Sequence, residues 1–140
     1  MILYHFTSLM ALGMTGAGEL DVHRQWPDGI LPQAANDEAG ALVCPDPVVW
    51  LTADPNPGGD GQGFVIRLAV RINSFDRHLV EHRRYMNRRF GKRSVDAAPD
   101  DYKKVLALAT PWRLYFGTIT PEKIVEVTGC TRPWWRCDHS

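Results

Sequence analysis

The stretch Ile-Leu-Tyr-His-Phe-Thr at residues 2–7 predicts the first strand of a buried sheet, because it combines β-branched, aromatic and aliphatic side chains over a short length. His5 lies inside this otherwise apolar run. Once the strand is buried, the histidine ring nitrogens need hydrogen-bond partners, so we expect polar groups beside it. Ser8 follows where it can cap a helix over residues 9–14, and the glycines after that segment should end the helix.

The rest of the chain alternates between apolar segments and turn-forming ones. The same criteria predict strands at residues 48–52, 64–72, 112–119 and 124–127, helices at 77–90 and 99–108, and a helical turn at 121–124. In the second of these strands Arg67 and Arg71 alternate with apolar residues, so one face should be apolar. Residues 25–48 are rich in proline and glycine and should be mostly loop. This order of elements favours a mixed α+β fold over a doubly wound parallel sheet.

The length and composition predict one soluble domain. A chain of 140 residues that is 44% hydrophobic fits a single core over residues 1–140, with residues 130–140 as a loosely packed tail. A two-domain enzyme is excluded. No apolar run approaches the ~20 residues that span a bilayer, and the start lacks the features of a signal peptide, so we expect a cytoplasmic protein. Three cysteines are too few and odd in number for a disulfide framework, which predicts free thiols.

The formal net charge of zero hides an uneven distribution along the chain. Residues 1–60 contain one basic residue, Arg24, and eight acidic residues, whereas residues 61–140 contain fifteen basic and eight acidic residues. Such asymmetry can mark an anionic partner. Attraction between the two halves of the chain is the alternative explanation, because surface charge also serves solubility.

Three motifs in this order resemble those of the ADP-ribosyltransferase-like superfamily. His5-Phe6-Thr7 is similar to its His-x-Thr/Ser motif on the first strand, residues 48–52 to a following strand, and Ile-Thr-Pro-Glu-Lys-Ile at 119–124 to its closing turn. The superfamily includes ADP-ribosylating toxins, DNA-targeting toxins and tRNA 2′-phosphotransferases. The resemblance implies a split antiparallel or mixed β-sheet with flanking helices. Trp-Arg-Leu-Tyr-Phe-Gly at 112–117 also resembles a strand of a group of small bacterial and phage proteins, a likeness that implies no activity.

The resemblance to the superfamily implies NAD, or a related ribose-phosphate molecule, as the ligand. His5 would bind the nicotinamide ribose, with Thr7 on the same strand and Thr52 on the following strand beside it. Trp50 or Tyr115 would supply the aromatic face on which nicotinamide stacks. Each of these roles is an expectation that comes from the resemblance.

Charged residues complete the implied site. The pyrophosphate needs cations with a planar fork of donors, and the candidates are Arg24, Arg67 and Arg71. ADP-ribosyl transfer in the superfamily uses a glutamate on a late strand. The strand at 112–119 contains Arg113 and no acid, so Glu122 and Glu126 are the candidate carboxylates. The tRNA 2′-phosphotransferases use histidine with several arginines instead, a set that His5, Arg67, Arg71 and Arg113 can imitate. A domain that kept the fold and lost catalysis, acting as a binding or inhibitory protein, is the alternative.

Two other patterns resemble metal sites. His-Leu-Val-Glu-His at residues 78–82 matches the inverted zinc-protease signature, which needs both imidazoles one turn apart on one helix face. The arginines around it would oppose a dication, and a solvated charged helix is the ordinary interpretation. Cys130, Cys137 and His139, with Cys44, form a Cys/His set whose spacing is loose for structural zinc. We therefore predict no metal site, and no sequence feature indicates that Cys44 is an activated nucleophile.

The segment 77–93 is strongly basic. Its arginines include Arg83, Arg84, Arg88 and Arg89, with Tyr85 and Phe90 interleaved. Arginine and aromatic side chains together can bind nucleic acid, the first by phosphate charge and the second by stacking on bases. A solvated helix, or contact with the acidic half of the chain, explains the same charges.

Overall fold

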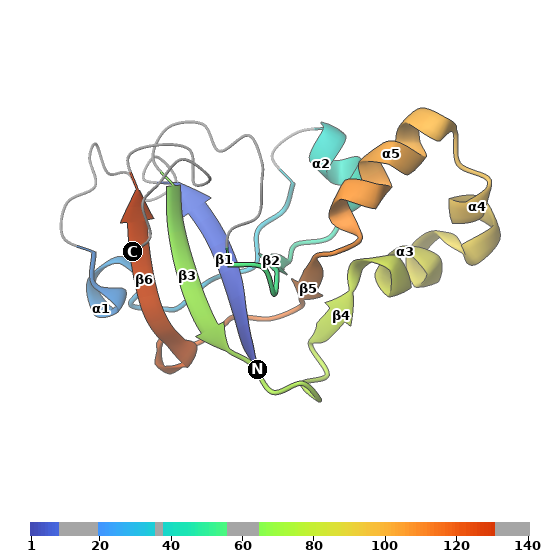
Figure 1. The fold of residues 1–140 in the computed structure, drawn as a ribbon. Coiled ribbons are helices and arrows are strands. Elements are labelled where there is room, and N and C mark those ends of the chain that lie inside the picture. The colour runs from blue at the N-terminus through green and yellow to red at the C-terminus, as the bar shows by residue number, and fades with distance from the viewer. Residues whose placement is uncertain (9–19, 36–37, 56–64, 131–140) are drawn as a thin grey trace. The chain divides into compact units, whose positions relative to one another are not determined.

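The computed structural model describes residues 1–8, 20–35, 38–55 and 65–130 (Figure 1). The chain divides into two compact units. Unit 1 consists of Met1–Ile30, Thr52–Asn73 and Ile119–Ser140, and unit 2 of Leu31–Leu51 and Ser74–Thr118. Within the described ranges, each unit contains a small three-stranded antiparallel sheet, and helices accompany both. The mixed α+β class expected from the sequence is confirmed.

Unit 1 is built on the sheet β1-β3-β6, whose strands lie side by side in Figure 1. β1 spans Ile2–Ser8, β3 Val65–Arg71 and β6 Ile124–Cys130. All three strands were expected, although β6 continues three residues beyond its expected end at 127. The short helix α1, Val22–Gln25, is capped by Asp21, whose side chain accepts a 3.1 Å hydrogen bond from the His23 backbone N–H. A 3-10 helix, η2, covers Pro121–Lys123, where a helical turn was predicted.

The register of the strands separates two faces of this sheet. Tyr4 pairs with Ala69 and His5 with Leu68 across β1 and β3, so consecutive residues of β1 point to opposite faces. Leu3, Ile66, Leu68 and Val70 have no exposed surface and form the apolar face. We call the opposite side, which carries Tyr4, Arg67 and Glu126, the polar face. The alternation predicted for residues 64–72 is confirmed.

Unit 2 contains the sheet β2-β5-β4 with helices around it. The strands are β2, Val49–Leu51, β4, Leu79–Glu81, and β5, Arg113–Tyr115; the helices are α2, Glu38–Val43, α3, His82–Phe90, α4, Lys92–Asp96, and α5, Asp100–Ala109. Met86, Leu106 and Leu114 meet in its core. Asp100 and Asp101 lie in the first turn of α5, where negative side chains interact favourably with the helix dipole.

Several sequence predictions for unit 2 are wrong in detail. The helix expected over 77–90 begins only at His82, because residues 79–81 pair with β5 instead. The described part of residues 25–48 is mostly loop, as predicted, but it also contains α2, where the Leu42 carbonyl accepts a hydrogen bond from the Tyr102 hydroxyl of α5. The strand expected over 112–119 is observed only over Arg113–Tyr115, as β5. The helix expected over 9–14 lies outside the described residues.

No helix in the described part of the chain is both long enough and apolar enough to cross a membrane. The longest of those named above is α5, which has ten residues. At a rise of about 1.5 Å per residue such a helix covers only about half of a bilayer's hydrocarbon core.

Candidate functional site

A cluster of polar groups surrounds Arg67 on the polar face of unit 1. The Arg67 Nη2 atom lies 3.7 Å from Glu126 Oε1 on β6, and Nη1 donates a 3.0 Å hydrogen bond to the Pro55 carbonyl. The guanidinium carbon lies 5.1 Å from the centre of the Tyr4 ring on β1, within the range of a cation–π contact. We call Tyr4, Pro55, Arg67, Glu126 and Thr128 the Arg67 cluster.

The strand register explains why these residues meet. Tyr4, Ala69 and Glu126 lie in one row across β1, β3 and β6. Arg67 is two residues from Ala69 and therefore on the same face, diagonal to both Tyr4 and Glu126. The alanine side chain between them is short, so the long arginine side chain can lie over it. A register irregularity follows at Ala69/Val70, where Val70 pairs with Ile124. The irregularity takes up Val125 of β6, so Ile124 and Glu126 lie on opposite faces although they are two residues apart.

The cation and the carboxylate of this cluster differ in their access to solvent. The Arg67 side chain is 13% exposed, whereas that of Glu126 is 62% exposed. Glu126 Oε1 accepts a 3.0 Å hydrogen bond from the Thr128 hydroxyl in addition to facing Arg67. Within the described residues, Oε2 of this carboxylate makes no hydrogen bond. The cluster thus presents an accessible carboxylate oxygen beside an oriented guanidinium.

The structure places His5 and Thr7 on the opposite face of the sheet. Their partners on β3 are Leu68 and Ile66, both on the apolar face. Both side chains are half-buried. The structure therefore does not bring His5 together with Glu126, although the two residues belong to the same sheet. The role of His5 as a ribose ligand stays a prediction.

Thr52 lies beside β1, and its expected place beside a ribose stays a prediction. Its backbone exchanges two hydrogen bonds with Tyr4, of 2.8 and 3.0 Å. Its hydroxyl oxygen accepts a 3.2 Å bond from the Asp54 N–H, and the residue is buried. Thr52 therefore holds the turn that follows it and joins that turn to the edge of β1.

The remaining unit 1 candidates are exposed and lie apart from the contacts of the Arg67 cluster. Arg24 is in α1, and Arg71 ends β3 on the same face as Arg67. Glu122 lies in η2, where a hydrogen bond from its own backbone N–H lowers the pKa of the carboxyl group. Of the two carboxylates considered from the sequence, only Glu126 contacts Arg67.

Trp50, Arg113 and Tyr115 belong to unit 2. The Trp50 ring packs 5.5 Å from the His82 ring, and Arg113 lies half-buried on β5. Tyr115 is buried and its hydroxyl donates a 2.8 Å hydrogen bond to Asp76. Burial, with that hydrogen bond, raises the pKa of Tyr115 to about 12. A ring buried in this way has no accessible face on which nicotinamide can stack.

The zinc-protease geometry is absent from residues 78–82. His78 precedes β4 and His82 begins α3, so the two imidazoles do not share a helix face. His82 donates through Nε2 to the Val43 carbonyl at 2.6 Å. Within the described residues no group of three His, Cys, Asp or Glu side chains can hold a metal ion. The set of Cys130, Cys137 and His139 lies outside the part whose side chains are described.

Cys44 is buried in unit 2. Burial raises the pKa of its thiol, and its Sγ–H donates to the Asp46 carbonyl at 3.4 Å. A thiol that is neutral and inaccessible at neutral pH is not an activated nucleophile.

Comparison of the chain with protein-family models, with curated proteins and with solved structures finds no match. Tyr4, Pro55 and Thr128 are the members of the Arg67 cluster that sequence reasoning missed. The alternation of side chains along a strand could have pointed to Tyr4. It lies two residues before Phe6, which pairs with Arg67, so Tyr4, Phe6 and Arg67 share one face of the sheet. The chemistry available at this site is that of one oriented guanidinium, one accessible carboxylate and one aromatic ring.

Proposed function

We propose that the chain binds NAD, or a related ribose-phosphate ligand, at the Arg67 cluster and transfers ADP-ribose to a macromolecule. The observation that carries this proposal is the placement of Arg67 and Glu126 on one face of the sheet, 3.7 Å apart. The sequence resemblance to the ADP-ribosyltransferase-like superfamily supplies the ligand class. Glu126 would then act as the late-strand carboxylate that this resemblance requires.

The arrangement suits the two ends of such a ligand. A guanidinium offers five N–H donors in a planar fork that matches phosphate oxygens, and at 3.7 Å its contact with Glu126 is too long for a hydrogen bond. A pyrophosphate can therefore approach the side of the guanidinium that faces Glu126, while Nη1 keeps its 3.0 Å hydrogen bond to the Pro55 carbonyl. Glu126 Oε2 can accept a hydrogen bond from a ribose hydroxyl. Tyr4 beneath the guanidinium keeps the arginine in place.

The transfer step needs stabilisation of positive charge on the ribose. The bond between nicotinamide and the ribose C1′ breaks, and nicotinamide leaves with the bonding electron pair. A nucleophile of the acceptor then bonds to C1′ and loses its proton to water. The Glu126 carboxylate, beside the ribose, would stabilise the cationic transition state by its charge.

The fold supports the same proposal. Two three-stranded antiparallel sheets with accompanying helices agree with the split sheet of an ADP-ribosyltransferase-like architecture, which we propose for this chain.

The proposal is tested by calorimetric titration with NAD and ADP-ribose, together with an assay for nicotinamide release. We expect Arg67→Lys to weaken binding about tenfold or more, because a charge-assisted bidentate contact contributes roughly 1.5–3 kcal/mol. Glu126→Gln should retain most of the binding and lose nicotinamide release. Arg71→Ala is the matched control, since Arg71 lies on the same strand and face but is exposed at its end; its affinity should stay within about threefold of the wild type.

Three outcomes would contradict the proposal. Absence of heat with either ligand would overturn it entirely. If His5→Asn abolished binding while Arg67→Lys did not, the ligand would lie on the other face of the sheet. If the wild type bound NAD but released no nicotinamide in the presence of cell extract as acceptor, the transfer step would be wrong and the chain would be a binding protein. Melting temperatures of all variants show whether a loss comes from unfolding.

A further inference from the structure

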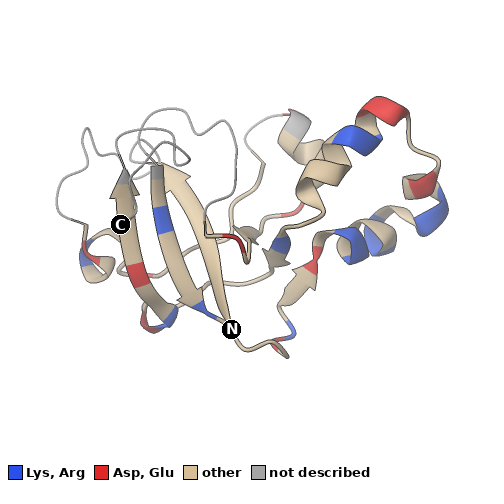
Figure 2. Cartoon of the chain, in the orientation of Figure 1, with Lys and Arg blue, Asp and Glu red and all other residues tan. Residues whose placement is uncertain are grey.

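Helix α3 of unit 2 carries an unusual concentration of positive charge. Four of its nine residues are arginines, none is acidic, and α4 adds Lys92 and Arg93 directly after Gly91. Figure 2 shows these basic residues gathered on α3 and α4. Arg83 and Arg84 lie in the first turn, where the helix dipole disfavours cations, and Arg84 and Arg88 are like charges at i,i+4. Arg88 and Arg89 lie in the last turn, where the dipole favours cations, so it is the placement of Arg83 and Arg84 that opposes helix stability and points to a role outside folding.

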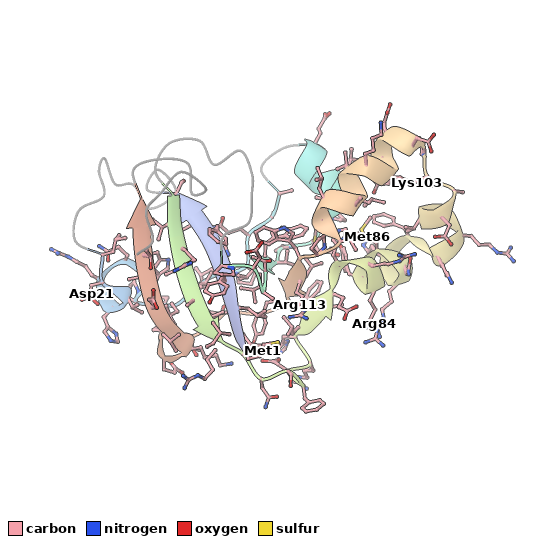
Figure 3. All side chains as sticks on the ribbon, viewed as in Figure 1. Met1, Asp21, Arg84, Met86, Lys103 and Arg113 are labelled. Atoms are coloured by element: carbon pink, nitrogen blue, oxygen red, sulfur yellow. The ribbon has the colours of Figure 1, made fainter. Side chains whose placement is uncertain are left out.

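The arginines are directed away from the core. His82, Tyr85 and Met86 form the buried side of α3, and Arg84 and Arg88 lie on the side opposite them. Figure 3 shows Arg84 extending from α3 on the side away from α5. Arg89 faces Asp46 at 3.4 Å. Within the described part of the chain, Arg83, Arg84 and Arg88 form no ion pair, so their charge is available to an anion.

A groove between α3, α4 and α5 lies on the side of α3 that carries Met86, and Arg83, which lines it, lies between Met86 and Arg84 around the helix. Its volume is about 250 Å³, and its lining includes Met86, Val95 and Leu106 together with Arg83, Lys103 and Asp96. This volume is below the roughly 300–1,000 Å³ of pockets for drug-sized ligands, and suits a single flat ring system. Its apolar residues can contact a ring face, while Asp96 can accept hydrogen bonds from an amino group. The cations in the same lining favour a ring that is attached to phosphate.

Phe90 adds an exposed aromatic ring at the end of α3. The residue is 43% exposed, and the Arg89 guanidinium lies 5.4 Å from the ring centre. Phe90 is seven positions after Arg83, so both lie on the same side of the helix. Exposed aromatic rings between arginines are typical of surfaces on which successive bases stack.

We infer that the surface of α3 and α4 binds a single strand of nucleic acid that passes around α3, with an unpaired base in the groove beside Met86, its phosphate on Arg83 in the groove lining, and the next phosphates on Arg84 and Arg88. A single strand is required because a base paired in a duplex cannot enter the groove. This surface belongs to unit 2 and the Arg67 cluster to unit 1, so either activity can be lost by substitution without the other.

The inference is tested by fluorescence anisotropy with labelled 12-nucleotide single strands of DNA and RNA over a range of salt concentrations. Each phosphate contact on a single strand contributes about 0.7 to the slope of log K against log salt, so Arg84→Ala/Arg88→Ala should lower the slope by about 1.4. At 0.1 M salt this difference corresponds to about 25-fold weaker binding. Arg24→Ala/Arg71→Ala removes the same charge from exposed positions of unit 1 and should change affinity little.

Filling the groove tests the base separately. Ala107 lines the groove and is exposed, so Ala107→Trp should occupy the space without disturbing the core. We expect about tenfold weaker binding with an unchanged salt slope, because stacking of one base contributes roughly 1–3 kcal/mol. The melting temperature of this variant confirms that it is folded.

Several results would overturn the inference. One is the absence of binding at low salt. Another is an equal affinity for duplex and single-stranded nucleic acid, because a paired base cannot enter the groove and the groove would then have no role in binding. Equal losses in the α3 double variant and the unit 1 double variant would show that only net charge matters. Binding of vesicles containing anionic lipid with the same affinity and the same dependence on Arg84 and Arg88 would identify a general anion surface instead.

Discussion

Replacing Gly29 with alanine should destabilise unit 1 far more than the same replacement at Gly91. Both glycines have positive φ, +81° and +86°, a conformation that side chains with a Cβ adopt at a cost. They differ in their surroundings. A Cβ at Gly29 would overlap the carbonyl oxygen of Ile119, whereas nothing lies within 4 Å of a Cβ at Gly91.

The expected magnitudes follow from these two situations. The positive φ costs an alanine at least about 1 kcal/mol at either position, although Gly91, with ψ 137°, lies outside the left-handed helical region. At Gly29 the backbone must also move away from Ile119, which exchanges hydrogen bonds of 2.8 and 2.9 Å with Ile30. Losing two backbone hydrogen bonds adds about 2 kcal/mol. The total is about 3 kcal/mol for Gly29→Ala, or a melting temperature lower by roughly 10 °C, against about 3 °C for Gly91→Ala.

Thermal and urea denaturation of the two variants and the wild type measure this difference. Gly91→Ala isolates the cost of the backbone conformation, so the excess at Gly29 reports the contact with Ile119. Equal destabilisation of the two variants would refute the reasoning, because the contact would then contribute nothing. A variant with Gly29→Ala that melts like the wild type would refute the φ argument as well.

Two further predictions concern burial. Burial lowers the pKa of His82 below its ordinary value of 6.5, so the folded state favours the neutral ring. The contribution of this residue to stability should therefore be complete above pH 6.5 and decrease as the pH falls below that value. In urea denaturation between pH 7.5 and 5, His82→Gln should show a weaker dependence of stability on pH than the wild type. A dependence that is unchanged in the variant would assign it to other groups. Leu68→Ala should lower the free energy of unfolding by about 2–5 kcal/mol, because the leucine is fully buried. Leu108 is 78% exposed, so Leu108→Ala should change the free energy of unfolding by no more than about 0.5 kcal/mol. Similar decreases for both variants would contradict the packing of the sheet.

Local sequence predicted those elements whose stability is mainly local. The composition of residues 2–7 predicted β1, and the alternation around Arg67 predicted β3 together with its buried and polar faces. The acids at the start of α5 agreed with its observed first turn. Helical spacing failed at residues 79–81, because pairing with β5 offered this segment hydrogen bonds that the sequence pattern does not reveal.

The site depended on contacts between distant parts of the chain. From sequence, Glu122 and Glu126 were equal candidates for the carboxylate, and three arginines were equal candidates for the pyrophosphate. The register of β6 against β3 brought Glu126 and Arg67 together on one face, and the alternation of β1 placed His5 on the other face. The amino-acid sequence by itself determined the α+β class, the strand faces and the basic character of α3. Only the tertiary structure decided which charges meet, because a shift of register by one residue moves every side chain of a strand to the opposite face.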